Sequence, residues 1–180
     1  TKVEICDKGF IQVDEQFKTG EPSIFAIGDV IGGAMLAHKA SAEGKKVVAV
    51  LADSSYSKKV NSIPAVVFTD PEIAWSGLTE TAAINDNIKI QVAKFPWGAS
   101  GRAQTLGRPD GVTKLIIDPK TEQILGVGIT GVGAGELIGE GALAIDKGLK
   151  VKDLANLIHP HPTLSETLME CAESFYGEAT

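Results

Sequence analysis

Residues 159–166 read His159-Pro160-His161-Pro162-Thr163-Leu164-Ser165-Glu166, and a helical pattern follows them directly. Apolar residues recur there at spacings of three and four, as in an amphipathic helix; they are Leu164, Leu168, Cys171 or Ala172, and Phe175. Thr163 is a suitable N-cap, and Glu166 three residues later completes the pattern of a capping box. The two prolines stiffen the approach and keep the histidine before each of them out of the helical conformation. The stretch therefore predicts a rigid, extended entry into a C-terminal helix.

The spacing of His161 and Glu166 suits an acid–base pair. Imidazole titrates near neutral pH, and a carboxylate on one ring nitrogen fixes the tautomer and makes the other nitrogen more basic. From the first turn of the predicted helix, Glu166 could lean back toward the ring of His161. The alternative is that Glu166 only caps the helix and His161 only fills a surface turn, and spacing alone favours this second interpretation.

Before this stretch, from residue 62 onward, strands come first and helices follow. This order predicts an α+β fold, with a mainly antiparallel sheet flanked by helices. The predicted strands are Ala65–Thr69, Ile73–Ser76, Ile88–Phe95, and a hairpin of Val112–Ile117 with Ile124–Thr130; a short helix follows Leu78, and further helices cover Gly135–Lys147 and Val151–Leu157.

Two glycine-rich segments lie within this region. The residues at 131–136, Gly-Val-Gly-Ala-Gly-Glu, follow a strand and open a helix, as a dinucleotide-binding loop does. The sixth position is Glu, however, and no βαβ unit is evident, so close packing of a helix carrying Gly139, Gly141, Ala142 and Ala144 is the preferred interpretation. The segment Phe95–Ala103 predicts a surface loop with an arginine and an aromatic residue.

Residues 1–61 are predicted to form a separate part of the chain. Phe10–Asp14 alternates as a short β element, Ser23–Asp29 reads as an apolar strand, and a long helix runs from about Met35 to Ala52. The composition around Ser54–Ser62 shifts to Ser, Lys, Asn and Tyr, as in a linker. We therefore divide the chain into domains 1–61 and 62–180.

The turn between the predicted strand and the long helix could bind an electron-rich ligand. A helix N-terminus offers unpaired N–H groups and a positive dipole, and Asp29 at the end of the strand could accept hydrogen bonds from sugar or ribitol hydroxyls. Taken alone, Gly28-Asp29 is equally well explained as an ordinary turn.

Composition excludes several classes of function. The 180 residues carry a net charge of −6, which argues against nucleic acid or an anionic membrane as a partner. The uninterrupted apolar runs are too short to span a bilayer. Cys6 and Cys171 form no Cys-x-x-Cys or Cys-x4-Cys pair, and the histidines and cysteines do not gather at the spacing of metal ligands. We expect no metal site and a reduced, cytoplasmic location of the bacterial type.

Four motifs together resemble the flavoprotein pyridine nucleotide-disulfide oxidoreductases, and among them the dihydrolipoyl dehydrogenase (E3) branch. That branch reads His-x-His-Pro-Thr-Leu-(Ser/His)-Glu where this chain has residues 159–166. Residues 24–29 with 35–40 are similar to the second flavin motif, and residues 95–103 and 64–74 are similar to bacterial E3 segments. The sequence Thr163-Leu164-Ser165 differs from the Thr-Ser-Ser of glutathione reductase-like relatives, and mercuric reductase-like relatives lack the histidine. Both differences favour the dihydrolipoyl dehydrogenase branch.

The resemblance implies roles for individual residues. His161 matches the general base and Glu166 its partner, with a cis peptide at His161-Pro162. Asp29 matches the residue on the FAD ribitol side, and Met35, Leu36, Ala37 and His38 match the turn against the flavin, so His38 is expected to line the cofactor.

The resemblance also implies a partial protein. A complete family member has a Gly-x-Gly-x-x-Gly FAD unit, a Cys-x4-Cys disulfide and an NAD domain, and none of these is present in this sequence. The chain starts at Thr1, and we expect a fragment or processed piece: residues 1–61 from the FAD-binding or central region, and 62–180 as the interface (dimerisation) domain.

In a complete homodimer, the implied reaction oxidises dihydrolipoamide on the E2 lipoyl domain of a 2-oxo acid dehydrogenase complex, and electrons pass through the disulfide and FAD to NAD+. The fragment alone is expected to be inactive. Two alternatives stay open: glutathione, trypanothione or mercuric ion as the substrate, or a dimerisation module without catalysis.

Overall fold

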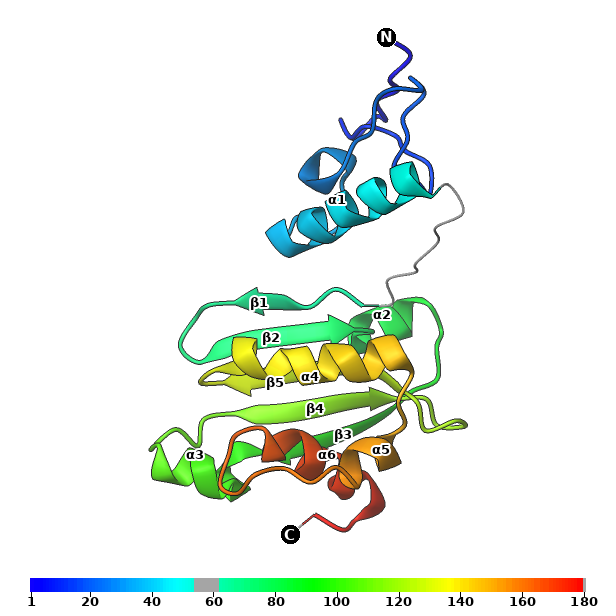
Figure 1. Ribbon diagram of the computed structural model, residues 1–180. Coiled ribbons are helices and arrows are strands. Elements are labelled where there is room, and N and C mark those ends of the chain that lie inside the picture. The colour runs from blue at the N-terminus through cyan, green and yellow to red at the C-terminus, as the bar shows by residue number, and fades with distance from the viewer. Residues whose placement is uncertain (54–61, 180) are drawn as a thin grey trace. The chain divides into compact units, whose positions relative to one another are not determined.

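A computed structural model describes residues 1–53 and 62–179 of the chain. It divides into two compact units, residues 1–59 and 60–180, which are described separately below (Figure 1). Most of the linker predicted at Ser54–Ser62, and the predicted domain boundary near residue 61, lie outside the described residues.

The C-terminal unit is built on one five-stranded sheet with the strand order β1-β2-β5-β4-β3. All four neighbouring pairs are antiparallel, so the predicted α+β fold with an antiparallel sheet is confirmed. The predicted hairpin is present as β4 and β5, with Leu115 opposite Val127. The strands are β1 Ala65–Val67, β2 Glu72–Gly77, β3 Gln91–Pro96, β4 Val112–Ile117 and β5 Ile124–Gly131.

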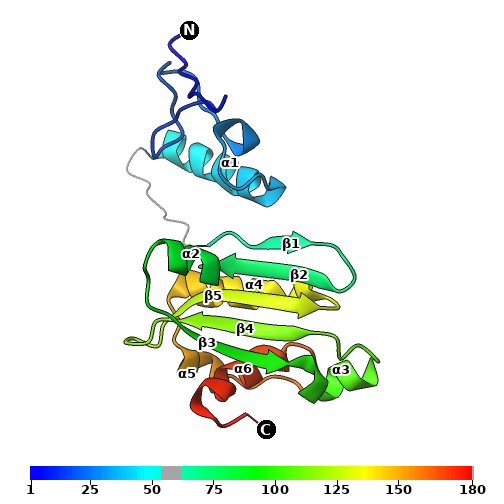
Figure 2. The same ribbon diagram turned by 180° about the vertical axis from the view of Figure 1, so that it is seen from behind.

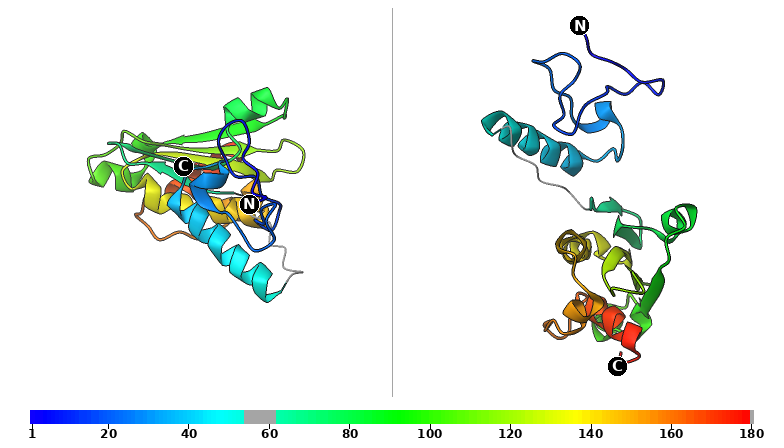
Figure 3. Two further views of the ribbon diagram at one scale, coloured as in Figure 1. Left: turned by 90° about the horizontal axis from the view of Figure 1, so that it is seen from above. Right: turned by 90° about the vertical axis from the view of Figure 1, so that its right-hand side faces the viewer.

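Three helices cover one face of this sheet: α4 Ala134–Lys147, α5 Val151–Ala155 and α6 Glu166–Tyr176. Helix α4 packs on β2 and β5, and α6 packs on β3 and β4 (Figure 1). From behind, the sheet lies in front of all three helices (Figure 2), and the side view of Figure 3 places them together on one side. The short α2 Glu80–Asn85 and α3 Gly101–Thr105 lie at the ends of strands.

The core lies between the sheet and these helices. Leu115, Ile129 and Leu168 are almost completely buried there, and burial of each such side chain stabilises the fold by roughly 1.5–3 kcal/mol. The apolar residues of the predicted hairpin strand β4 and those at the helical spacing predicted after residue 163 thus meet in one core. This core places α6 against β4 and the edge strand β3.

The glycines of α4 were predicted to allow close packing, and the structure confirms this at one of two positions. A Cβ atom on Gly141 would lie 2.9 Å from Cγ1 of Val127 on β5, so the helix approaches the sheet closely there. Gly139 instead faces open space. The glycine-rich loop before α4 follows β5, a strand of an antiparallel sheet and not of a βαβ unit. At the start of α4, the Gly135 N–H donates to Oε2 of Glu72 at 2.9 Å, so a carboxylate of the chain itself lies where a dinucleotide-binding loop would bind phosphate.

The segment Phe95–Ala103 is not the surface loop that its glycines suggested. It continues β3 into a short 3-10 helix at Trp97–Ala99 and then into α3. Trp97 is fully buried, and its backbone N–H donates to the carbonyl of Gly111 at 2.9 Å. The prediction failed because an aromatic side chain next to glycines can lie inward or outward, and only the neighbouring strands decide which.

The N-terminal unit contains the helix α1 Ala37–Ala52 and a 3-10 turn at Gly28–Ile31. The strands predicted at Phe10–Asp14 and Ser23–Asp29 are wrong: within residues 1–53 there are only isolated bridges, Ile5 with Ile11 and Lys18 with Phe25. An apolar run forms a strand only beside a partner strand, and the described part of this unit supplies none. Helix α1 also starts two residues later than predicted, because Leu36 is extended.

Candidate active site

His161 and Glu166 form a direct hydrogen bond at the entry to α6. Nδ1 of the imidazole lies 2.8 Å from Oε1 of the carboxylate. The other carboxylate oxygen accepts the backbone N–H of Thr163 at 2.6 Å. Because both oxygens are held, the carboxylate has one orientation, and it directs one edge of the imidazole toward itself.

This contact decides which ring nitrogen is available for chemistry. A carboxylate only accepts hydrogen bonds, so Nδ1 of His161 carries the proton of the contact, and Nε2 of the neutral ring keeps its lone pair. Burial raises the pKa of Glu166, but the Thr163 N–H and the His161 ring outweigh it, and the net pKa lies below its ordinary value. The side chain of His161 is 77% exposed while that of Glu166 is 16% exposed, so a shielded carboxylate holds an accessible imidazole.

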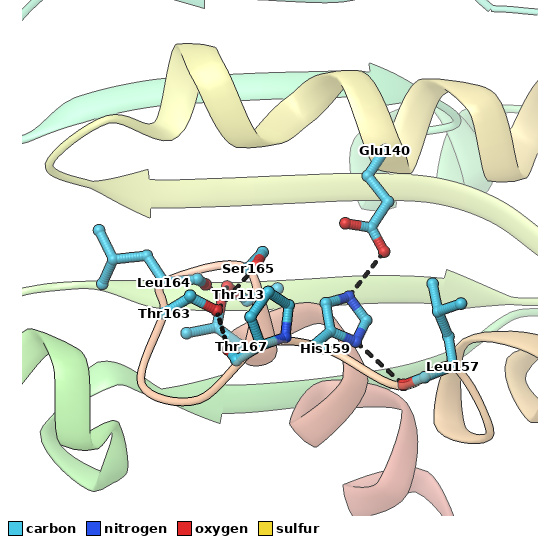
Figure 4. Close-up of polar contacts among 9 residues, drawn as sticks. Thr113, Glu140, Leu157, His159, Thr163, Leu164, Ser165 and Thr167 are labelled. Atoms are coloured by element: carbon cyan, nitrogen blue, oxygen red, sulfur yellow. Dashed lines mark hydrogen bonds and ion pairs between the residues drawn. The ribbon is translucent and has the colours of Figure 1, made fainter.

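The capping box predicted for Thr163 and Glu166 is only half formed. Glu166 bonds back to the Thr163 N–H, but the helix begins at Glu166 after Ser165, and the Thr163 hydroxyl does not cap it. That hydroxyl donates instead to the carbonyl of Pro160 at 2.8 Å and lies 2.9 Å from Oγ of Ser165 (Figure 4). The peptide between His161 and Pro162 is cis, as the family resemblance implied.

His159 has a structural environment that the sequence did not reveal. Its Nδ1 lies 3.0 Å from the carbonyl of Leu157, and its Nε2 lies 2.9 Å from Oε1 of Glu140 on α4 (Figure 4). Only 5% of its side chain is exposed. Glu140 precedes His159 by 19 residues, and no local pattern of residues could have linked the two. The shielded histidine therefore fixes the segment to α4, and the exposed one is left for chemistry.

The residues expected to line a flavin lie together at the start of α1. Asp29 is exposed in the 3-10 turn, Met35 and Leu36 lead into the helix, and Ala37 and His38 form its first turn. Leu36 provides no side-chain cap, and the N-terminus of this 16-residue helix is the positive end of its dipole. This geometry fits an electron-rich group at the helix end, and the carboxylate of Asp29 could accept hydrogen bonds from its hydroxyl groups.

The backbone of this turn is held by the helix behind it. Lys39 is buried and donates to the carbonyl of Gly32 at 3.1 Å, and it forms an ion pair with Glu43 at 2.9 Å. Glu43 also accepts the N–H of Gly28 at 2.7 Å. The 3-10 turn that carries Asp29 is thereby attached to α1. No local pattern in the sequence pointed to Lys39 or Glu43 as its supporting residues.

The two cysteines are not paired with each other. Cys171 lies inside the core on α6, and burial raises the pKa of its thiol to about 12. Residues 1–53 and 62–179 contain no group of three or more His, Cys, Asp or Glu residues that could hold a metal ion. Over the same residues, no helix is long and apolar enough to cross a membrane.

Comparison with known proteins identifies both parts of the chain. The model of the pyridine nucleotide-disulphide oxidoreductase dimerisation domain matches residues 63–172, and the model of the pyridine nucleotide-disulphide oxidoreductases matches residues 1–44. The dihydrolipoyl dehydrogenase of Vibrio parahaemolyticus is 46% identical over 178 residues, which are 99% of this chain and 38% of that protein. The one from Buchnera aphidicola of the pea aphid Acyrthosiphon pisum is 48% identical over the same shares. The chain thus spans about 38% of the length of these relatives.

Solved structures agree with this assignment. The Cu(II) complex of the HOCl-induced flavoprotein disulfide reductase RclA from Escherichia coli aligns with a TM-score of 0.85 and 30% identity, over 96% of this chain and 40% of that one. LpdA from Mycobacterium tuberculosis aligns with a TM-score of 0.87 and 25% identity, over 96% of this chain and 38% of that one. The chain therefore belongs to the pyridine nucleotide-disulphide oxidoreductase family and contains its dimerisation domain.

Proposed function

We propose that this chain is the C-terminal part of a dihydrolipoyl dehydrogenase and supplies its acid–base pair, part of its FAD site and its dimer interface. The observation that carries the proposal is the contact of His161 Nδ1 with Glu166 Oε1 at 2.8 Å, which leaves Nε2 on an exposed edge. Identities of 46–48% to dihydrolipoyl dehydrogenases over 99% of the chain support this substrate class.

The proposed chemistry begins with proton removal from dihydrolipoamide. Nε2 of His161 takes the proton of one thiol, and Glu166 stabilises the imidazolium that forms. The resulting thiolate attacks one sulfur of a redox disulfide elsewhere in the protein, and the other sulfur leaves as a thiolate. The second thiol of the substrate then loses its proton and displaces the enzyme sulfur. Lipoamide leaves as a disulfide, and the enzyme sulfurs keep the two electrons as a dithiol once they take up the two protons that the substrate thiols lost.

Asp29 and the first turn of α1 are proposed to hold the FAD. Asp29 would accept hydrogen bonds from ribitol hydroxyls, and the positive end of the α1 dipole, at Ala37, would favour the negative charge that accumulates at the pyrimidine edge on reduction. Bound FAD supplies a two-electron acceptor between the dithiol and NAD+. Met35 and Leu36 would exclude water from that edge.

The proposed active protein is a homodimer, in which His161 of one subunit serves the disulfide of the other. The match of residues 63–172 to a dimerisation domain supports this arrangement, and an isologous interface would then be obligatory for turnover. The proposed partner is the lipoyl domain of an E2 subunit. We place the protein in the bacterial cytoplasm, in keeping with relatives from bacteria and two unpaired cysteines.

The test is His161→Gln in the full-length enzyme that contains this chain. Turnover with dihydrolipoamide and NAD+ should fall by at least about a hundredfold, while the flavin absorbance stays unchanged. Glu166→Gln should lower turnover less and in the same direction. Glu173→Gln, further along α6, is the matched control and should retain full turnover. Near-normal turnover of His161→Gln would disprove the base assignment.

The alternative is a substrate other than dihydrolipoamide, because RclA, a flavoprotein disulfide reductase, aligns with a TM-score of 0.85. The full-length enzyme should be assayed with dihydrolipoamide, glutathione disulfide and mercuric ion in parallel, and the proposal requires dihydrolipoamide to be the best of the three. The 180-residue chain itself should be tested by visible absorption and mass in solution. A colourless dimer would support a dimerisation module that needs the rest of the protein for catalysis.

A further inference from the structure

Three buried side chains connect the β3–β4 side of the sheet to the segment that carries His161. Nε1 of Trp97 lies 3.0 Å from Oγ1 of Thr113 on β4, and that oxygen lies 2.9 Å from Oγ1 of Thr167 on α6. Oγ1 of Thr167 lies 2.7 Å from the carbonyl oxygen of Leu164. Trp97, Thr113 and Thr167 are all completely buried. Figure 4 shows Thr113, Thr167 and Leu164 in this row beneath the turn.

The two ends of this row determine the direction of every hydrogen bond in it. The indole N–H of Trp97 can only donate, and the carbonyl of Leu164 can only accept. The Thr113 hydroxyl therefore accepts from Trp97 and donates to Thr167, whose own proton goes to Leu164. Each hydroxyl has one orientation, and no member can rotate without leaving a buried polar atom unpaired.

Trp97, the first residue of this row, is held in place by the backbones around it. A Cβ atom on Gly111 or Gly131 would lie 2.3 Å from the ring of Trp97, so both backbones lie directly against the indole. The Trp97 ring therefore fits a slot that only glycine can form. On the other side, the thiol of Cys171 donates to the carbonyl of Thr113 at 3.4 Å, which ties α6 to the same point of β4.

The far end of the row lies inside the turn that orients the acid–base pair. The Leu164 carbonyl accepts from both the hydroxyl and the backbone N–H of Thr167, at 2.7 and 3.1 Å. The residues on either side of Leu164 complete the turn: the Thr163 N–H donates to Glu166 Oε2, and Ser165 precedes the first residue of α6. A shift of Leu164 would therefore move the donor and the carboxylate that fix the ring of His161.

We propose that Thr167 is a positioning residue for His161, with Thr113 and Trp97 as its support. The row sets the position of Leu164, the turn at residues 163–166 sets the carboxylate of Glu166, and that carboxylate selects the Nδ1–H tautomer and the direction of Nε2. The consequence for turnover rests on the function proposed above, whereas the consequence for the tautomer does not depend on it.

The first test uses Thr167→Val in the 180-residue chain. Valine has the shape of threonine and removes both the donor to Leu164 and the acceptor for Thr113. Nitrogen-15 NMR of the imidazoles shows which ring nitrogen carries the proton, and His161→Gln assigns the signal. In the unmodified chain, His161 should carry its proton on Nδ1. In Thr167→Val it should shift toward the Nε2–H form of a free imidazole, as in Glu166→Gln, and Thr167→Ser should restore the original spectrum.

Thr105→Val is the matched control. The Thr105 hydroxyl also donates to a carbonyl three residues earlier, that of Arg102 at 2.9 Å, but it is exposed on α3 and takes part in no hydrogen bond of the row. Its removal should leave the His161 signal unchanged. If Thr167→Val does not fold, Trp97→Phe breaks the row at its origin while it leaves both threonines in place, and it should give a smaller shift in the same direction. An unchanged His161 tautomer in both variants would overturn the proposal.

The second test uses the full-length enzyme. Thr167→Val should lower kcat for dihydrolipoamide by about tenfold with little change of KM and an unchanged flavin spectrum, because a small misalignment of a base acts on the chemical step. Thr167→Ser should restore most of kcat. A tautomer shift without any loss of kcat would contradict the function proposed for His161 but leave the positioning intact. A loss of kcat that serine does not rescue, without a tautomer shift, would mean that Thr167 has only a packing role.

Discussion

Nε2 of His159 lies 2.9 Å from Oε1 of Glu140, which joins the segment before α6 to the middle of α4. The Nδ1 of the same ring faces the carbonyl of Leu157, so both ring nitrogens meet acceptors. A neutral imidazole has a single N–H, so it can donate to only one of these two acceptors at a time. His159 thus differs from His161, whose second nitrogen is exposed.

This relationship predicts energetic coupling between Glu140 and His159. In a double-mutant cycle of Glu140→Ala and His159→Ala, urea unfolding of the 180-residue chain should give a coupling free energy of about 0.5–3 kcal/mol. Glu136→Ala, one turn earlier on α4 and exposed, is the control, and it should be additive with His159→Ala within about 0.5 kcal/mol. Additive effects of Glu140 and His159 would show that the contact contributes nothing to stability.

The depressed pKa of Glu166 predicts a loss of stability in acid. Its folded-state pKa lies below the ordinary value of 4.5 because the Thr163 N–H and His161 outweigh burial. The stabilisation is therefore complete above the unfolded-state pKa and is lost as the pH falls through the folded-state pKa. Urea unfolding from about pH 7 to about pH 3 should show a smaller acid loss in Glu166→Gln than in the unmodified chain. Equal pH profiles of the two proteins would contradict the prediction.

The two glycines of α4 predict opposite effects of the same substitution. Gly141→Ala places a Cβ within 3.0 Å of three side-chain atoms of Val127, so unfolding free energy should fall by about 1–3 kcal/mol. Gly139→Ala faces open space and should gain up to about 1 kcal/mol, because alanine has the higher helix propensity. Thermal and urea unfolding of the two variants would measure the difference. Similar effects at both positions would show that α4 is not closely packed on β5.

The two thiols should differ in reactivity. Backbone hydrogen bonding at Phe10 and Lys8 lowers the pKa of Cys6, whereas burial raises the pKa of Cys171 to about 12. Iodoacetamide at about pH 8 should therefore alkylate the folded chain at Cys6, and mass spectrometry should detect a second adduct only after denaturation. Cys6→Ser should remain unlabelled when folded. Fast labelling of Cys171 in the folded protein would mean that the core around α6 opens readily.

Local patterns predicted most elements of the C-terminal unit, although not the 3-10 helix and α3 within Phe95–Ala103. Two apolar segments on either side of a turn predicted β4 and β5 as a hairpin, and spacings of three and four predicted α6, because the residues that decide such elements lie within a few positions of one another. The contact of His161 with Glu166 spans five residues and was accessible for the same reason. In the N-terminal unit, where no partner strand is present among the described residues, local patterns predicted strands that do not form.

The surroundings of the acid–base pair depend on contacts that no local pattern encodes. Thr113 and Thr167 are 54 residues apart, and Glu140 and His159 are 19 apart, yet each pair is in hydrogen-bond contact. These pairs meet because α4 and α6 pack on the same sheet, and Trp97 is buried against two glycine backbones, Gly111 just before β4 and Gly131 at the end of β5. The primary structure thus specifies the contact of His161 with Glu166 and the elements that carry it. The packing of the sheet against α4 and α6 decides which histidine is shielded, which is exposed, and in what direction the exposed ring points.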